Sequence, residues 1–274
     1  MQSLIFTEQF YYPEGWGGAQ VPRDITTHLA AAGFDVSVIC GSDLYAPVEG
    51  ELGPDPEQRG VRILRIPRLL GGDIHSRKLL RQLWFYLLSV PALLSHGRPQ
   101  LYVTQTNPPL MVPIVAAIAR LRGVPLLIIA QDLYPEVMVA HGMVGKDSFP
   151  TRLLNRVFRA AYGSASKVVA LGSTMAERLY EKGVAPERVS IISNWATGDE
   201  QVVTGAANVL RKSWNLEGKF VVLYSGNLGI AHDIQTPIRA LKLALEREPN
   251  IRLVIVGKGP RLQDAKDLVV ELGL

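Results

Sequence analysis

Asp132 is a candidate catalytic residue in this 274-residue sequence, because it follows the apolar segment Leu126–Ala130. A carboxylate at the carboxyl end of a buried strand lies where α/β proteins bind their ligands. There it can orient a hydroxyl group or offset a positive charge. Glu136 follows in the same segment and is a second candidate. The alternative for Asp132 is a structural one, in which its side chain caps the next short helix.

Paired glycines form a second kind of candidate, a site for an anion. In the stretch YPEGWGGAQVPRD, Gly17 and Gly18 separate an apolar opening segment from a helical pattern that runs from about Ala19 to Ala32. Because glycine has no Cβ atom, the backbone there could approach a phosphate held by the free N–H groups of the helix N-terminus. The alternative is a simple turn, which also favours glycine.

The elements that would position these residues alternate between strand and helix patterns. Short β-branched segments separate longer stretches in which apolar residues have helical spacing. This alternation predicts an α/β fold, with helices covering both faces of a parallel sheet. The predicted strands are Leu4–Thr7, Asp35–Cys40, Val61–Ile66, Leu101–Thr104, Leu126–Ala130, Lys167–Leu171 and Val189–Ile192.

The pattern starts again after a polar, glycine-containing segment, which predicts two Rossmann-like domains. We expect the first at residues 1–195, a linker at 196–210 and the second at 211–274. Two such domains would bind ligands at the carboxyl ends of their strands. The second part contains predicted strands at Phe220–Tyr224 and Ile251–Val256, glycine loops at Gly226–His232 and Gly257–Pro260, and a helix at Gln235–Glu246.

Composition excludes several classes of function. The 29 basic and 25 acidic residues give a net charge of only +4, without the dense basic surface of a nucleic-acid binder. Cys40 has no second cysteine for a disulfide, and no leader pattern precedes the first strand. The apolar runs Leu83–Leu94 and Pro108–Ala119 are shorter than the roughly 20 residues that span a bilayer. We therefore expect a cytoplasmic protein that can lie on a membrane without crossing it.

The histidines do not predict a metal site. They are scattered, and neither an HxxxH nor a CxxC spacing occurs. The five residues are His28, His75, His96, His141 and His232.

An ordered set of short motifs resembles the family 4 glycosyltransferases of the GT-B type, and most closely the bacterial subgroup that builds O-antigen and exopolysaccharide units, including colanic acid transferases. The resemblance covers the chain from end to end. The motifs are GGAQ with AAGFDVSVIC, then TNPPL, QDLYPE, ALGSTMAERLYEKGV, ISNW, LYSGNLG and VGKGP.

The resemblance implies a retaining glycosyltransferase that uses a nucleotide diphosphate sugar, for which we expect a UDP-sugar, and no metal or other cofactor. The acceptor would be lipid-linked or a saccharide. The first domain would be the acceptor side and the second would bind the donor nucleotide. Asp132 would be the catalytic residue and Glu136 would contact the acceptor, whereas Asn107 before Pro108 is typical of a turn. The residues expected to bind the donor are Gly17, Gly18, Asn194, Gly226, Asn227, His232 and Lys258.

The chain departs from the family at the second glycine loop. Most members have an Arg directly after the glycine that matches Gly226 and a Lys five residues later, where this chain has Asn227 and His232. A mostly neutral histidine is a poor substitute for a fixed cation beside a diphosphate. Lys258 in VGKGP is a candidate replacement, with a solvated lysine as the alternative.

Two helical segments combine basic and apolar residues, which is typical of peripheral binding to a membrane's cytoplasmic leaflet. The alternative is that both are amphipathic helices packed on the sheet with solvated cations. The first segment has Arg77, Lys78 and Arg81 beside Leu80, Leu83, Trp84, Tyr86 and Leu87. The second has Arg152, Arg156 and Arg159 beside Leu153, Val157 and Phe158.

Two other functions compete with an active transferase. Family members continue beyond the point that matches Leu274, so the second domain is expected to be incomplete, and one alternative is that this form is inactive. In that case the chain is a non-catalytic remnant that binds only acceptor or membrane. A nicotinamide-dependent oxidoreductase is disfavoured, because the first loop reads GWGGAQ rather than GxGxxG and no acidic residue ends the segment Asp35–Cys40.

Overall fold

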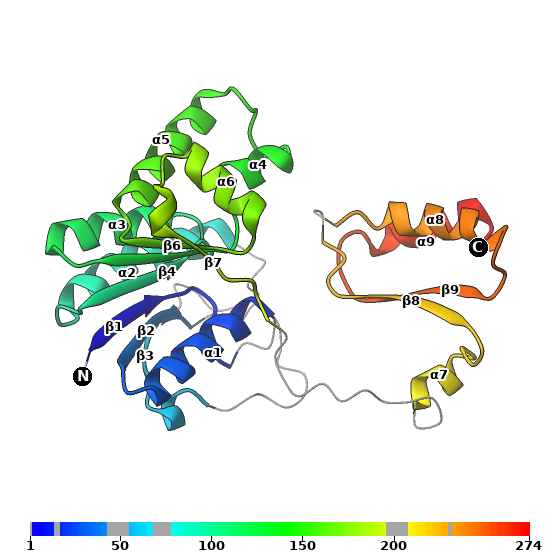
Figure 1. The fold of residues 1–274 in the computed structure, drawn as a ribbon, viewed down its shortest axis with the longest axis horizontal. Helices are drawn as coiled ribbons and strands as arrows, with labels where there is room; N and C mark the ends of the chain where they lie inside the picture. Colours follow the sequence, from blue (N-terminus) through cyan, green and yellow to red (C-terminus); the bar gives the residue numbers. More distant parts are fainter. Residues whose placement is uncertain (1, 14–16, 43–54, 68–77, 196–207, 230–231) are drawn as a thin grey trace. The chain divides into compact units, whose positions relative to one another are not determined.

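The computed structural model describes residues 2–13, 17–42, 55–67, 78–195, 208–229 and 232–274. Arg77 and most of the predicted linker lie outside these ranges, as does the side chain of Lys78. The chain divides into two compact units, Met1–Thr197 (unit 1) and Gly198–Leu274 (unit 2), which are coloured along the sequence in Figure 1.

Unit 1 contains a parallel sheet of seven strands in the order β3-β2-β1-β4-β5-β6-β7. The strand order reverses between β1 and β4, and doubly wound sheets bind ligands at the carboxyl ends of the strands beside such a reversal. Every strand predicted for this part of the chain is confirmed, with ends that agree within one residue. The strands are β1 (Ser3–Thr7), β2 (Asp35–Gly41), β3 (Arg62–Ile66), β4 (Leu101–Gln105), β5 (Leu126–Ala130), β6 (Lys167–Ala170) and β7 (Val189–Ile191).

Alternate residues of the strands enter two separate cores, as period-2 side-chain geometry requires. Ile5 belongs to the larger core, whereas its neighbours Leu4 and Phe6 belong to the other. Figure 1 shows α1 on one side of the sheet and α2, α3 and α5 on the opposite side, so the predicted two-sided covering is confirmed. These helices are α1 (Gly17–Ala31), α2 (Lys78–Ser95), α3 (Met111–Arg122) and α5 (Phe149–Ser164).

The described residues of unit 1 also form shorter helices. They are α4 (Glu136–Ala140), α6 (Ser173–Glu181) and the 3-10 helices η1 (Glu57–Arg59) and η2 (Pro186–Arg188).

The helix α1 begins earlier than the sequence indicates. Gly17 and Gly18 are its first two residues, so they lie in the first helical turn and not in the loop before it. Pro22 is the sixth residue of this helix and lies inside it, where it has no N–H group to donate to the Gly18 carbonyl. The helix ends just before Gly33, whose φ of 89° favours glycine.

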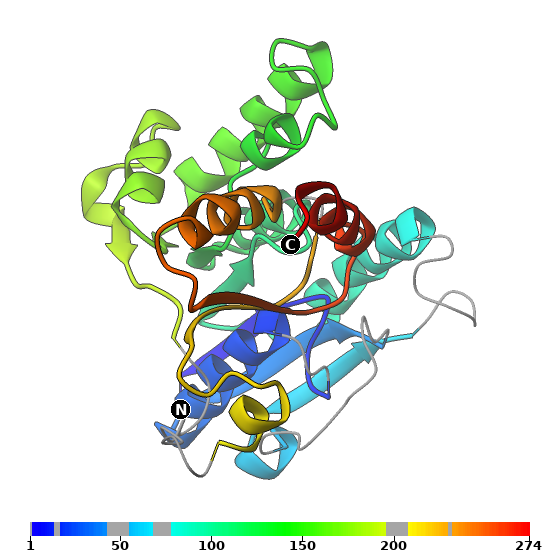
Figure 2. The same cartoon turned by 90° about the vertical axis from the view of Figure 1, so that its right-hand side faces the viewer.

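Unit 2 has two parallel strands, β8 (Phe220–Ser225) and β9 (Ile251–Val256), among its described residues. Both were predicted from the sequence. Figures 1 and 2 show α8 (Gln235–Leu245) and α9 (Leu262–Leu272) side by side on one face of this pair, and α7 (Val209–Ser213) precedes it. Five buried apolar residues among those described in this unit form a small core, which consists of Leu228, Ile234, Ile238, Ala265 and Leu268.

Candidate active site

The carboxyl end of β5 is fixed by a threonine from the neighbouring strand. The buried Thr106, just after β4, accepts hydrogen bonds through Oγ1 from the backbone N–H groups of Gln131 and Asp132, each at 2.9 Å. This contact sets the direction in which the chain leaves the sheet. The sequence analysis missed Thr106, because its role depends on the pairing of β4 with β5.

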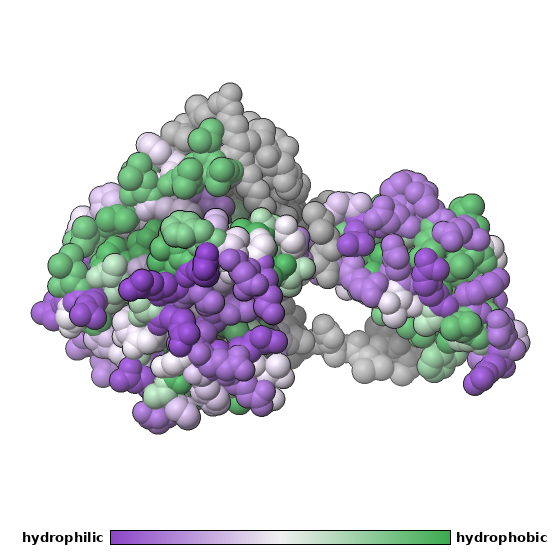
Figure 3. All heavy atoms as spheres, turned by 90° about the horizontal axis from the view of Figure 1, so that it is seen from above, coloured by the Kyte–Doolittle hydropathy of each residue, from purple (hydrophilic) through white to green (hydrophobic). Residues whose placement is uncertain are grey.

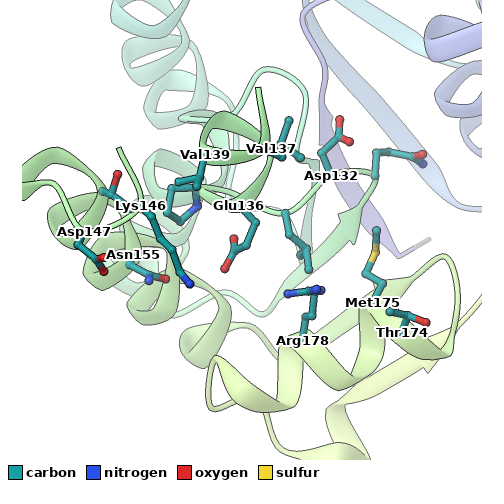
Figure 4. Close-up of a pocket in the computed structure, with 15 residues that line it drawn as sticks. Asp132, Glu136, Val137, Val139, Lys146, Asp147, Asn155, Thr174, Met175 and Arg178 are labelled. Atoms are coloured by element: carbon teal, nitrogen blue, oxygen red, sulfur yellow. The ribbon is translucent and has the colours of Figure 1, made fainter. Parts of the chain in front are cut away.

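A cavity of about 800 Å³ opens at this edge of unit 1 (Figure 4). The turn after β5 and the helix α4 form one part of its wall, and α5, α6 and the loop before α5 form the rest. It brings together Asp132 and Glu136, the two carboxylates predicted from the sequence. The lining residues are Gln131, Asp132, Leu133, Pro135, Glu136, Val137, Val139, Ala140, Lys146, Asp147, Thr151, Asn155, Thr174, Met175 and Arg178.

Asp132 presents a carboxylate without a protein partner to this cavity. Among the described residues, none makes a hydrogen bond or ion pair with its side chain, and the N-cap of α4 is Pro135. The structural alternative, in which Asp132 caps that helix, is therefore wrong. Surrounding protein atoms desolvate the carboxyl and raise its pKa above the ordinary value, an effect that the positive charge of His141 partly offsets. Its catalytic role stays a prediction.

Glu136 is held by a buried lysine that the sequence analysis missed. Lys182 Nζ lies 2.7 Å from Glu136 Oε1, and the lysine side chain is 5% exposed. The same nitrogen donates to Asn155 Oδ1 at 3.1 Å and to the Tyr134 carbonyl at 3.3 Å. A buried ammonium is stable only when charge and hydrogen bonds replace its water shell, so Lys182 and Glu136 stabilise each other. The two residues are far apart in the sequence, so the pair can be recognised only in the folded structure.

Asn194 also reaches the end of β5. Its Nδ2 donates to Gln131 Oε1 at 2.9 Å, and Gln131 Nε2 donates to Asn194 Oδ1 at 3.2 Å. The next residue, Trp195, donates from Nε1 to Asp24 of α1 at 3.4 Å. Asn194 therefore contacts Gln131, the residue before Asp132 in the sequence. Its predicted contact with the donor stays a prediction.

The first glycine pair lies at the N-terminus of a well-anchored helix. Tyr11, which follows β1, forms a hydrogen bond of 2.5 Å with Thr26 of α1, and both side chains are buried. Arg65 of β3 donates to the Tyr12 carbonyl at 2.7 Å and holds the same loop from the other side. The first N–H groups of any α-helix have no partner within the helix, and in α1 Gly17 and Gly18 are the first two residues. An anion site requires such N–H groups.

In unit 2 the loops after β8 and β9 interlock through their backbones. Leu228 N donates to Lys258 O at 2.8 Å, and Gly226 N donates to Val256 O at 2.9 Å. A Cβ atom on Gly257 would lie 1.9 Å from Gly226 O, and one on Gly259 would lie 2.4 Å from Leu228 O. The glycines of VGKGP are therefore needed for contact between the two loops.

The residues that replace the family's cations lie in these loops. Tyr224 OH lies 2.6 Å from His232 Nδ1 and 2.9 Å from the carbonyl of Asn227, so the tyrosine joins both ends of the first loop. Asp233 then caps α8 by accepting from the N–H groups of Gln235 and Thr236, each at 3.1 Å. The structure thus brings Gly226, Asn227, His232 and Lys258 together at one edge of unit 2.

Metal ligands and membrane spans can be assessed in the described ranges. Within these ranges, no three or more His, Cys, Asp or Glu side chains gather as a metal site would require. Among the same residues, no helix has the length and apolar character needed to cross a bilayer.

The two predicted membrane-binding segments differ in the structure. In α2 the predicted interface residues Arg81 and Tyr86 are buried, which contradicts their assignment, while Leu80, Leu83 and Leu87 are exposed. The helix packs its Arg81 face on the sheet, because Phe85 and Leu93 lie on that side. In α5 the basic row is exposed, and so are Leu153 and Val157, whereas Phe158 is buried in the core. The exposed positions of the basic row are Arg152, Arg156 and Arg159.

Comparison with known families identifies the chain. The family described as "Glycosyl transferase 4-like domain" matches residues 17–195, and the family described as "Glycosyl transferases group 1" matches residues 207–274. The first match covers more than half of the chain, from the start of α1 to Trp195. The chain therefore belongs to the glycosyl transferase 4-like family, and the predicted resemblance is confirmed.

Two curated relatives carry names of glycosyltransferases. WbjE of Pseudomonas aeruginosa, named as a glycosyltransferase, is 27% identical over 76% of this chain and 52% of its own length. WcaI of Escherichia coli, named as a colanic acid biosynthesis glycosyl transferase, is 26% identical over 91% of this chain and 64% of its own length. The chain thus spans between half and two thirds of the length of these relatives.

Solved structures confirm the fold class. HepE of Anabaena, solved in complex with UDP and glucose, matches all of this chain and 67% of its own, with a TM-score of 0.62 and 16% identity. Sucrose-phosphate synthase of Thermosynechococcus elongatus matches all of this chain and 68% of its own, with a TM-score of 0.58 and 17% identity. At such low identity the likeness shows the fold alone, which is of the GT-B type.

Proposed function

We propose that this protein is a retaining glycosyltransferase that moves a sugar from a UDP-sugar to a lipid-linked or saccharide acceptor in cell-surface polysaccharide synthesis. The observation that carries the proposal is the cavity at the end of β5, where Asp132 offers an unpaired carboxylate. It is supported by the family match of both units and by the names of the two curated relatives.

Asp132 has the properties that acceptor activation needs. When a nucleotide sugar reacts, the anomeric carbon becomes positively charged and an acceptor hydroxyl attacks it. A carboxylate beside that hydroxyl can orient it and offset the positive charge. Desolvation makes the ionised form of Asp132 less stable, and a hydroxyl donor or a nearby cationic centre would relieve that cost. Glu136, whose Oε1 pairs with Lys182 Nζ at 2.7 Å, is suited to bind acceptor hydroxyls in the same cavity.

The donor's diphosphate is assigned to backbone groups and to the interlocked loops of unit 2. Helix N-termini bind phosphate without a metal, which suits the start of α1 at Gly17 and Gly18. Gly226, Asn227, His232 and Lys258 lie together in unit 2 and complete the proposed donor residues with Asn194 of unit 1. No cofactor or metal is required by this proposal.

Transfer assays with nucleotide sugars test the function. We expect UDP-sugars to support transfer to a lipid-linked or saccharide acceptor, with the product anomer, read by NMR, matching the donor. Asp132→Asn should lower kcat/KM by roughly 100-fold or more, because a positioned carboxylate contributes that much to proton transfer. Glu217→Gln, which removes an exposed charge in unit 2, is the matched control.

The pH profile gives a second reading of the same assay. Because the pKa of Asp132 is raised, its carboxylate form should become populated at a higher pH than an ordinary aspartate. Activity should therefore rise with pH through that raised pKa, and the Asn variant should lose this limb of the profile. Equal activity of Asp132→Asn and wild type would remove Asp132 from the mechanism, and inverted products would contradict retention.

We also propose that the protein binds the cytoplasmic leaflet of the membrane through α5. Its basic row lies beside Phe149, Leu153 and Val157, which are 72%, 51% and 37% exposed. Figure 3 shows hydrophobic side chains gathered on the visible face of unit 1 with hydrophilic ones next to them. Cations beside apolar side chains favour anionic lipid surfaces.

Co-sedimentation with anionic vesicles tests this location. Replacing Arg152, Arg156 and Arg159 with Gln should weaken binding by roughly 100-fold, since each cation contributes about 1 kcal/mol near such a surface. Added salt should weaken wild-type binding as well. The matched control replaces Lys212, Lys242 and Arg247 of unit 2 with Gln, which are exposed. Equal loss in both triple variants would show that only net charge matters.

A further inference from the structure

A tyrosine supports the histidine that this chain has in place of the family's lysine in unit 2. Tyr224, near the end of β8, packs its ring against the small core of this unit. Its hydroxyl oxygen lies 2.6 Å from His232 Nδ1 and 2.9 Å from the Asn227 carbonyl oxygen. The imidazole itself is exposed, whereas Tyr224 is half-buried. His232 is therefore held on its Nδ1 side and accessible to solvent.

The single proton of the tyrosine hydroxyl determines the state of the imidazole. A carbonyl oxygen can only accept, so the contact with Asn227 is a hydrogen bond only if Tyr224 donates to it. Tyr224 must then accept from His232, which requires a proton on Nδ1. In the neutral imidazole the other nitrogen, Nε2, consequently has no proton and can only accept.

Protonation of this imidazole breaks no hydrogen bond to Tyr224. A proton taken up at Nε2 leaves the bond between His232 Nδ1 and the tyrosine hydroxyl in place. It converts Nε2 from an acceptor, which cannot bind a phosphate oxygen, into a cationic donor, which makes a charge-assisted hydrogen bond to one. Contact between this histidine and an anion therefore requires the protonated form.

The space beside Nε2 lies next to Gly229. A Cβ atom on this glycine would lie 3.4 Å from Asn227 Nδ2 and 3.9 Å from His232 Nε2. Because glycine has no side chain, a ligand oxygen can approach the position between these two nitrogens. Such an oxygen would have a neutral amide donor on one side and the titrating imidazole on the other.

The charged residues around His232 keep their charge where an imidazole titrates. Asp233 follows it, Lys258 lies in the loop after β9, and Arg261 is the N-cap of α9. Hydrogen bonds from the Thr236 hydroxyl and backbone N–H hold the pKa of Asp233 below its ordinary value. Lysine, arginine and tyrosine side chains do not ordinarily titrate between about pH 5 and 8, whereas imidazole does. Of these groups, His232 is the one expected to change its charge in this range.

We propose that Tyr224 is a positioning residue for His232: it fixes the proton on Nδ1, so that Nε2 binds the donor's diphosphate when protonated and releases it when neutral. The Arg and Lys that most family members have at the positions of Asn227 and His232 keep their charge, whereas this chain would bind its donor more tightly as the pH falls. This inference rests on the proposed function and names how the donor contact in unit 2 is regulated.

NMR of the ring nitrogens tests the positioning without a ligand. The signals of His232 are assigned by their loss in His232→Gln. At about pH 8, where imidazole is ordinarily neutral, we expect wild type to carry the proton on Nδ1. Tyr224→Phe keeps the aromatic ring in the core but removes the acceptor, so this preference should be lost. A proton on Nε2 in wild type, or an unchanged tautomer in Tyr224→Phe, would overturn the role of Tyr224.

Isothermal titration of the full chain with UDP-glucose tests the anion contact. Its diphosphate is blocked at both ends and keeps its charge between about pH 5.5 and 8, unlike a terminal phosphate with a second pKa near 6. Wild type should bind at least about tenfold more tightly at the lower pH, because a charge-assisted hydrogen bond is gained. His232→Gln should bind equally at both pH values. The matched control is His28→Asn, which replaces an exposed histidine of α1 and should behave like wild type.

The same titration of Tyr224→Phe separates positioning from a general loss of structure. Loss of positioning should reduce the difference between the two pH values, whereas structural damage would weaken binding equally at both. Wild-type affinity that is equal at both pH values, or a pH effect that persists in His232→Gln, would overturn the proposal. Absence of UDP-glucose binding at both pH values would also overturn it.

The outcome is separable from that of the proposed function. Transfer by wild type together with pH-independent binding of UDP-glucose would refute this inference while the function stands. Acid-dependent binding that is lost in His232→Gln, without transfer to any lipid-linked or saccharide acceptor, would support the inference and refute the function.

Discussion

The two units hold the carboxyl ends of their strands in different ways. In unit 1 the end of β5 is fixed by side chains: Thr106 accepts from two backbone N–H groups, and the Asn194 and Gln131 amides pair with each other. In unit 2 the loops after β8 and β9 are fixed by backbone–backbone hydrogen bonds, such as Leu228 N to Lys258 O at 2.8 Å. Side-chain hydrogen bonds therefore fix the end of β5 in unit 1. The loops of unit 2 can approach each other because Gly257 and Gly259 have no side chains.

This difference has a consequence for substitution. A side-chain anchor can be removed one hydrogen bond at a time, so the end of β5 should respond in graded steps. A backbone contact that depends on glycine has no intermediate state, because any Cβ atom meets a carbonyl oxygen that cannot move freely. The largest effects are therefore expected in unit 2, although its core is the smaller one.

The largest effect is expected for Gly257→Ala. The new Cβ atom would lie 1.9 Å from Gly226 O, so the loops must separate, at a cost of about 3 kcal/mol or more. Hydrogen exchange should become faster for the amides of β8 and β9 while those of β4 and β5 keep their protection. Gly229→Ala is the control, because its Cβ atom would lie 3.4 Å from the flexible Asn227 side chain. Unchanged exchange in β8 would show that the loops accommodate the methyl group.

An intermediate effect is expected for Thr106→Val in unit 1. Valine keeps the shape of the side chain but leaves the N–H groups of Gln131 and Asp132 without their acceptor, which should cost about 2 kcal/mol. Thr106→Ser keeps the hydroxyl and is the matched control. Urea denaturation measures the difference. Similar stability of the Val and Ser variants would mean that water replaces the threonine, and the strand end would not be side-chain anchored.

The sequence predicts the strands well because the sheet is buried on both faces. Segments such as Leu126–Ala130 are apolar throughout and flanked by helical patterns, so their pattern alone indicates a parallel strand. The helix faces are harder to predict. In α2 the spacing of Leu80, Leu83 and Leu87 indicates an apolar stripe, but it does not show that Arg81 and Tyr86 face the sheet instead.

The candidate site is only partly visible in the sequence. Asp132 and Glu136 can be predicted because α/β folds bind ligands at the carboxyl ends of their strands. Lys182 and Thr106 cannot, since each acts through a neighbour that only the folded chain brings close. Gly257 could be identified as a loop residue, but its contact with Gly226 O depends on how two loops meet.

The smallest effect is expected for Asn194→Ala, which removes the amide pair with Gln131. Both side chains are solvent-accessible, so water replaces the lost bonds and the unfolding free energy should fall by less than about 1 kcal/mol. Gln131→Ala should cost as much, and the double variant should cost no more than either single one if the two amides act only on each other. A role in donor binding would separate them: titration with UDP would then show weaker binding for Asn194→Ala than for Gln131→Ala at equal stability. Equal UDP affinity in both variants would confine Asn194 to anchoring the end of β5.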